Sequence, residues 1–111
     1  MSEGIRTILY PVRDLEQAKA RFSELAGVAP DADAPYYVGF TIGDQHIGLV
    51  PNSPHPGVVP YWHVDDIRAK LKILQDSGAE TVEDVKDVGG GRLVASVKDP
   101  DGNIVGLLQD A

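Results

Sequence analysis

The stretch Asp99–Gln109 reads DPDGNIVGLLQ and joins a tight turn to an apolar strand. Pro100 has the fixed φ that suits the second position of a turn, and Gly102 tolerates a positive φ. The apolar run Ile104–Leu108 that follows is typical of a buried strand. The earlier stretch Gly43–Val50, GDQHIGLV, has the same order of a turn followed by an apolar strand with a central glycine. The pattern therefore indicates that the chain contains an internal repeat.

The first half of the chain predicts a strand, a helix and a hairpin. Ile5–Val12 is rich in β-branched residues and predicts a strand. Asp14 is a suitable N-cap for a helix that ends at Gly27. The apolar residues of this helix recur at helical spacing and are Leu15, Ala18, Phe22 and Leu25. Tyr36–Ile42 and Gln45–Val50 predict a hairpin, so the first unit has the order β-α-(β)-β-β.

The second half repeats this order after a proline-rich linker at residues 51–57. Val58–Val64 predicts a strand, Asp66 caps a helix that ends at Gly78, and Arg92–Lys98 forms a hairpin with the last strand. Each repeat is too short to build a sufficient core alone. We therefore expect one domain, residues 1–111, made of βαβββ repeats at residues 1–50 and 58–111. The fold class is α+β, with curled mixed sheets around a cup-shaped cavity and the helices outside.

Composition excludes several classes of function. The 111 residues include no cysteine, so disulfides and thiolate chemistry are excluded. The formal net charge of −7 is the wrong sign for binding phosphate backbones, and we expect no nucleic-acid partner. No apolar run approaches the length of a membrane span and no signal segment is evident, so we expect a cytoplasmic protein without a membrane partner.

The doubled order and its motifs resemble the glyoxalase, bleomycin-resistance and extradiol-dioxygenase family, also called the vicinal oxygen chelate superfamily. The motifs are Val12–Leu15 at the start of the first helix, its copy Val64–Ile67, and the turn Asp99–Asn103. The resemblance covers nearly the whole chain and implies the cup-shaped fold. It does not identify a reaction, because the family includes isomerases, lyases, dioxygenases, epimerases and drug-binding proteins.

The resemblance also implies where a metal would be held. Metal-binding members take ligands seven residues before each helix-starting Asp and from each last strand. Those positions are occupied here by Thr7, Val59, Gly48 and Gly106. Valine and glycine have no ligating side chain, and one threonine hydroxyl does not hold a divalent ion. We therefore expect no metal and no other cofactor, and we expect these positions to contact a ligand instead.

Alternation along the strands adds further candidates for ligand binding. The residues expected on the cavity face together with those four positions are Tyr37, Thr41, His46, Tyr61 and His63. Gly89–Gly91 is interpreted as a mobile flap that ends at Arg92, which joins the candidates. A tyrosine offers an aromatic wall and one polar group, but it is also common as filler in half-buried sheets.

Other residues have a simpler interpretation. His46, beside a hairpin turn, is more often exposed, and His55, among prolines, is expected to be solvated. His63 is equally consistent with a pocket residue and with a hydrogen-bonded structural one. Trp62 should point away from the cavity and lie in the core under the helices.

Three functions remain open. The preferred hypothesis is a protein that binds or sequesters a small organic molecule without a metal. The excess of acidic over basic residues favours a cationic ligand. The second is a metal-dependent lyase, isomerase or dioxygenase whose ligands lie elsewhere. The third is a metal-free enzyme that uses His63 or Tyr61 as a general acid or base. Because members of the resembled family commonly form dimers, we also expect a homodimer.

Overall fold

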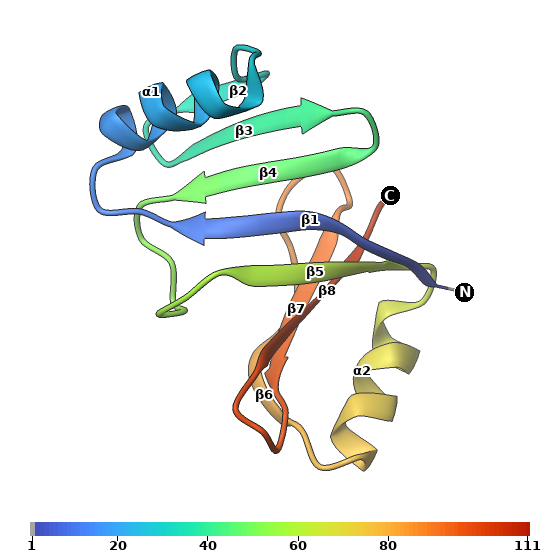
Figure 1. The fold of residues 1–111 in the computed structure, drawn as a ribbon. Coiled ribbons are helices and arrows are strands. Elements are labelled where there is room, and N and C mark those ends of the chain that lie inside the picture. Colours follow the sequence, from blue (N-terminus) through green and yellow to red (C-terminus); the bar gives the residue numbers. More distant parts are fainter. Residues whose placement is uncertain (1) are drawn as a thin grey trace. The chain divides into compact units, whose positions relative to one another are not determined.

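The computed structural model describes residues 2–111, and the chain divides into two compact units. The N-terminal unit is Thr7–Val59. The C-terminal unit is Pro60–Ala111 together with the chain up to Arg6, so the first strand runs through the boundary between them. Each unit is described by itself (Figure 1).

The N-terminal unit contains one helix and four strands. The elements are β1 (Ser2–Pro11), α1 (Leu15–Ala26), β2 (Ala32–Ala34), β3 (Tyr37–Ile42) and β4 (Gln45–Val50). The strands are ordered β2-β3-β4-β1, and β1 runs parallel to β4 while the other pairs are antiparallel. Helix α1 therefore serves as the crossover between strands of one mixed sheet. It lies along one face of this sheet, against β3 and β4.

The C-terminal unit repeats this plan. Its elements are β5 (Val59–Val64), α2 (Ile67–Asp76), β6 (Glu80–Asp87), β7 (Leu93–Lys98) and β8 (Ile104–Gln109). The strands are ordered β5-β8-β7-β6, with β5 parallel to β8 and antiparallel pairs elsewhere. The predicted α+β class and the doubled βαβββ order are therefore confirmed. The shared cup stays a prediction.

Both helices begin at the aspartates that the sequence predicts. The Asp14 side chain accepts a hydrogen bond from the backbone N–H of Gln17 at 3.1 Å, and Asp66 accepts one from Ala69 at 3.1 Å. Both aspartates have extended backbone, as an N-cap requires. Helix α1 ends at Gly27, whose φ of 73° is in the left-handed region that favours glycine.

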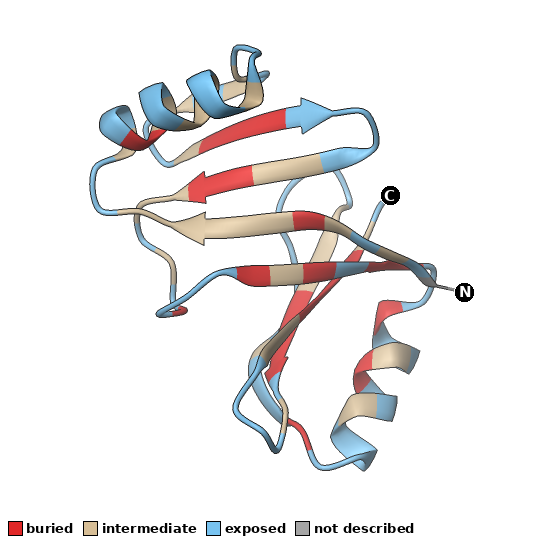
Figure 2. Ribbon diagram, in the orientation of Figure 1, coloured by how far each residue is buried: buried red, intermediate tan, exposed pale blue. Residues whose placement is uncertain are grey.

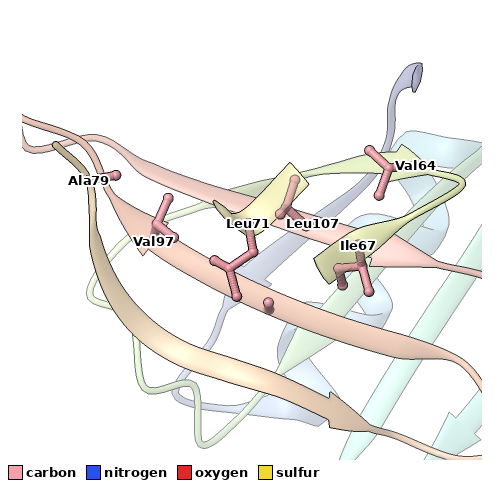
Figure 3. Packing of buried hydrophobic residues seen from close by; sticks show 7 residues of the cluster. Val64, Ile67, Leu71, Ala79, Val97 and Leu107 are labelled. Carbon is pink, nitrogen blue, oxygen red and sulfur yellow. The ribbon is translucent and has the colours of Figure 1, made fainter. Parts of the chain in front are cut away.

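Each unit buries one face of its sheet under its helix. The N-terminal cluster is Ala18, Val38, Phe40 and Leu49, with partly buried neighbours that include Leu15 and Phe22. The C-terminal cluster is Val64, Ile67, Leu71, Ala79, Ala95, Val97 and Leu107. Figure 3 shows Leu71 of α2 lying over the strands that carry Val97 and Leu107. Figure 2 marks the buried residues of both units in red.

Two apolar residues lie outside the core that the sequence predicts. Leu25 is 79% exposed, because Ala26, four residues after Phe22, takes the buried position on that turn of α1. Trp62 is 40% exposed and borders a hollow beside α2 with Ile73 and Leu74. Its predicted direction, toward the helix, is correct. Its predicted place in the core is wrong, because α2 leaves part of the indole uncovered.

The turn before β8 has the predicted geometry. The Asp99 carboxylate accepts hydrogen bonds from the backbone N–H groups of Asp101 at 3.0 Å and Asn103 at 2.8 Å. These bonds, with that of Asn103 the strongest, lower the pKa of Asp99. The Asp99 N–H also donates to the Asn103 carbonyl at 2.9 Å, which closes the β7–β8 hairpin. Among the described residues, no helix is long and apolar enough to cross a membrane.

The capping contacts predict a measurable loss of stability. Replacing Asp66 with Ala should lower the free energy of unfolding by about 1 kcal/mol, because the Ala69 N–H loses its acceptor. Asp66→Ser should retain most of the stability, because serine offers a capping oxygen. Urea denaturation followed by circular dichroism measures both variants, and equal losses in the two would contradict the capping role.

Candidate functional site

The candidate site is built on the sheet faces opposite the helices. In the C-terminal unit, Tyr61 of β5 pairs with Gly106 of β8, and Gly106 pairs with Ser96 of β7. The Tyr61 ring lies directly on Gly106, since a Cβ atom built there would meet ring carbons at 2.6–2.7 Å. A glycine is needed wherever another group approaches the backbone this closely. Tyr61 thus covers the place where the resemblance implies a metal-ligating side chain.

The N-terminal unit has the same arrangement. A Cβ atom built on Gly48 of β4 would lie 2.6 Å from the Tyr37 hydroxyl oxygen and 2.5 Å from Leu9 Cδ2. Gly39 of β3, which pairs with Gly48, is covered by the same Tyr37 ring at 2.8 Å. Each ring fills the space that a glycine opens on the sheet. The space beside Gly48, Gly39 and Gly106 is therefore occupied by tyrosine rings.

The residues at the four implied ligand positions do not fit a divalent metal. Thr7 of β1 is 4% exposed and Val59 of β5 is 1% exposed, while Gly48 and Gly106 carry no side chain. The set therefore offers one hydroxyl oxygen, where a bound metal normally requires several carboxylate or imidazole groups. Among residues 2–111, no group of three or more His, Cys, Asp or Glu side chains is placed to hold a metal ion.

Polar groups in the C-terminal unit converge around His63. His63 is 2% exposed on β5, and its Nδ1 atom lies 3.6 Å from Asp110 Oδ2. Arg92 donates to Asp110 Oδ1 from Nε at 2.9 Å and approaches the same oxygen with Nη2 at 2.8 Å. The predicted residues His63 and Arg92 are therefore brought together by a carboxylate that the prediction missed. Side chains alternate between the two faces of a strand, so Asp110 follows Gly106 and Leu108 on the face that carries His63. This alternation could have indicated Asp110 from the sequence.

The predicted flap before Arg92 forms a hydrogen-bonded turn. Arg92 donates its N–H to the Gly89 carbonyl at 3.1 Å, and Val88 donates to the Arg92 carbonyl at 2.9 Å. Gly89, Gly90 and Gly91 all have positive φ, which explains the run of three glycines. Motion of this segment stays a prediction.

His46 lies in a polar row of the N-terminal unit. Cα pairing aligns Thr7 of β1, His46 of β4 and Thr41 of β3 across three strands. The Thr41 hydroxyl donates to Asp31 Oδ2 at 2.6 Å and lies 3.3 Å from His46 Nδ1. Since the threonine proton is used toward the carboxylate, His46 Nδ1 is the donor in the second contact. Asp31 is a further residue that the prediction missed, since its side chain comes from the loop before β2.

Burial determines the charge state of Tyr61. Burial raises the pKa of Tyr61 to about 12, and the negative charge of nearby Glu83 contributes in the same direction. Glu83 of β6 lies opposite Ser96 and forms an ion pair of 2.7 Å with Lys86. Tyr61 is therefore a neutral hydrogen-bond donor near pH 7 and not a base.

Two further placements correct the sequence interpretation. His55, expected to be solvated, is only 5% exposed, and its backbone N–H donates to the Ser53 hydroxyl at 3.1 Å. Surface hollows of the C-terminal unit include one at the Asp99–Gly102 turn and one beside Trp62, each of about 370 Å³. None of the predicted site residues lines either hollow.

Comparison with known proteins identifies the fold. A family model described as the Glyoxalase/Bleomycin resistance protein/Dioxygenase superfamily matches residues 4–107. A solved member of that superfamily from Vibrio splendidus 12B01 is 18% identical, with a TM-score of 0.74 over 100% of both chains. No curated protein sequence matches the chain.

Other solved structures share the fold and carry different activities in their names. Methylmalonyl-CoA epimerase from Mycobacterium tuberculosis is 17% identical, with a TM-score of 0.73 over 99% of this chain and 89% of that one. A protein described as NAD-dependent benzaldehyde dehydrogenase from Legionella pneumophila is 13% identical, with a TM-score of 0.74 over 95% and 98%. At these identities the likeness is one of fold alone.

The contact between Tyr61 and Gly106 predicts a cost for a single methyl group. Gly106→Ala should lower the free energy of unfolding by about 1–3 kcal/mol, because the methyl must displace the ring. Gly57→Ala is the matched control, since a Cβ atom there would meet nothing within 4 Å. Urea denaturation measures both variants, and equal stability of the Gly106→Ala and Gly57→Ala proteins would show that the ring does not occupy this space.

The raised pKa of Tyr61 predicts a loss of stability in alkali. An unfolded tyrosine loses its proton near pH 10, whereas folded Tyr61 keeps its proton to about pH 12. The contribution of Tyr61 to the free energy of unfolding is therefore constant below about pH 9. Stability is lost as the pH rises from about 10 to 12, because the unfolded state releases this proton first. Tyr61→Phe should remove this component from the pH dependence of unfolding. An unchanged slope in that variant would contradict the burial of the hydroxyl.

Proposed function

We propose, from the premise that this chain belongs to the Glyoxalase/Bleomycin resistance protein/Dioxygenase superfamily, that it binds a small organic molecule without a metal. The observation that carries the proposal is the packing of Tyr61 on Gly106 and of Tyr37 on Gly48. At both positions an aromatic ring lies where the metal-binding relatives are expected to carry a ligand. Aromatic walls with a few polar groups are typical of small-molecule sites.

Three residues of the C-terminal unit can give such a ligand its orientation. Tyr61 supplies a hydroxyl that stays protonated at neutral pH. His63 supplies a buried imidazole, and Asp110 next to it supplies negative charge. The net charge of −7 favours a ligand with a positive charge or several hydrogen-bond donors.

The second candidate is a metal-free enzyme in which His63 transfers a proton. The contact between His63 Nδ1 and Asp110 supports it, because a carboxylate beside an imidazole stabilises the imidazolium that forms when the ring accepts a proton. Tyr61 would then act as the hydrogen-bond donor or general acid. Its raised pKa argues against a role as the base.

Metal content and ligand affinity test the proposal together. Protein purified from culture supplemented with zinc, iron, manganese and nickel should contain far less than one of these metals per chain. A thermal-shift screen of small organic molecules in buffer with a chelator should then yield a ligand for calorimetry. Tyr61→Ala should weaken its binding by about 1–3 kcal/mol, the scale of one aromatic contact.

Tyr36→Ala is the matched control, because Tyr36 is 75% exposed and should not contribute to affinity. One bound metal per chain that is lost in His46→Ala or His63→Ala would overturn the proposal in favour of a metal-dependent lyase, isomerase or dioxygenase. Equal affinity in the Tyr61→Ala and wild-type proteins would place the binding surface elsewhere.

A further inference from the structure

The charged groups around His63 are arranged in a way that the proposed binding role does not require. Asp110 comes directly after β8, and its side chain is 53% exposed, while that of His63 is 3% exposed. An exposed carboxylate normally samples many orientations and contributes little to a neighbour's charge state. Here a second residue holds it in one orientation.

Arg92 holds the carboxylate by one oxygen. Both Nε, at 2.9 Å, and Nη2, at 2.8 Å, approach Asp110 Oδ1. Asp110 Oδ2 is the oxygen that faces His63 Nδ1, at 3.6 Å. The two oxygens therefore have separate partners, and the guanidinium sets which oxygen is directed at the imidazole.

The backbone holds Arg92 and Asp110 in register. Arg92 ends the turn that its own N–H closes on the Gly89 carbonyl. At the start of β7, Leu93 pairs with Gln109, so the residues next to this pair, Arg92 and Asp110, face one another. The chain also passes close to Gly91, where a Cβ atom would lie 2.9 Å from Ala111 Cβ. The turn and the last residues of the chain thus form one contact region.

Other charged and titratable groups on this face are Tyr61, Glu83 and Lys86. Lys86 pairs in register with Val94, and Glu83 pairs with Ser96. The 2.7 Å ion pair between Lys86 and Glu83 largely cancels their charges. Tyr61 is neutral below about pH 12. Of these groups, Asp110 is the one that an ion-pair contact joins to His63.

We propose that Arg92 and Asp110 are positioning residues that set the tautomer and the proton affinity of His63. This inference rests on the proposed function for the role of His63 as a directional group. At 3.6 Å the contact between Asp110 Oδ2 and His63 Nδ1 is longer than a hydrogen bond and acts on the ring through its charge. A negative charge beside Nδ1 favours the neutral ring with its proton on Nδ1, which leaves Nε2 as the acceptor. The same carboxylate stabilises the imidazolium, so His63 gains a proton at a higher pH than it would without Asp110.

Nuclear magnetic resonance of the imidazole nitrogens tests this without any ligand. The chain has three histidines, so single His→Ala variants assign the ring signals of His46, His55 and His63. In the wild-type protein we expect the neutral His63 ring to be protonated on Nδ1. In Asp110→Asn the midpoint of the His63 titration should fall by about one pH unit or more, the usual effect of removing an adjacent opposite charge.

Arg92→Gln distinguishes positioning from simple charge. If Arg92 acted only through its positive charge, removing it would raise the His63 midpoint. If it positions Asp110, Arg92→Gln should lower the midpoint toward that of Asp110→Asn, and the double variant should match Asp110→Asn alone. Arg92→Lys should recover only part of the shift, because an ammonium lacks the planar fork.

A neutral ring protonated on Nε2 in the wild-type protein, or an unchanged midpoint in Asp110→Asn, would overturn the inference. A raised midpoint in Arg92→Gln would also overturn the positioning role of Arg92. Both residues lie at the surface, so the variants should keep the fold, and their amide spectra test this. Because the measurement uses neither metal nor ligand, its failure is separate from a failure of the proposed function.

Discussion

Each unit depends on the burial of one helix against one face of its sheet. A crossover helix between two parallel strands must lie over the sheet, and the apolar faces of both are then removed from water together. In the C-terminal unit this burial joins Ile67 and Leu71 of α2 to Val97 and Leu107 of the strands. In the N-terminal unit it joins Ala18 of α1 to Phe40 and Leu49. The opposite face of each sheet is thereby left to carry the polar side chains.

The opposite faces share a tyrosine that lies over a glycine. A sheet glycine leaves a gap between its neighbours, and an aromatic ring from an adjacent strand fills that gap at little entropic cost, because a tyrosine has few rotatable bonds. Tyr61 and Tyr37 do so in the two units. Gly48 and Gly106, two of the four positions that the superfamily resemblance connects with metal binding, are thus covered by aromatic rings. That aromatic surface is the physical basis for proposing an organic ligand.

Both units also combine a histidine with a carboxylate, but they do so differently. In the N-terminal unit the Thr41 hydroxyl stands between Asp31 and His46. In the C-terminal unit Asp110 faces His63 directly and is held by Arg92. The two arrangements do not follow from the repeat, because His46 lies on a fourth strand and His63 on a first strand of its module.

The sequence by itself determined the framework. The capping residues Asp14 and Asp66, the hairpin turns and the alternation of apolar residues are local signals, and local geometry is sufficient to interpret them. The repeat of Gly48 at Gly106 was also visible, and with it the family, which the match over residues 4–107 confirms. The alternation placed Tyr61 and His63 on one face and Trp62 on the other, as found.

Only the tertiary structure decided what fills the space around those residues. The distance between a ring on β5 and a glycine on β8 depends on how the strands pack, so the sequence did not indicate that Tyr61 covers Gly106. The burial of His55 depends on how the linker folds, and the exposure of Trp62 depends on how far α2 extends over the sheet. Asp110 became part of the site because Arg92 reaches it from a turn 18 residues earlier. Contacts between residues far apart in the chain depend on side-chain packing, which periodicity does not specify.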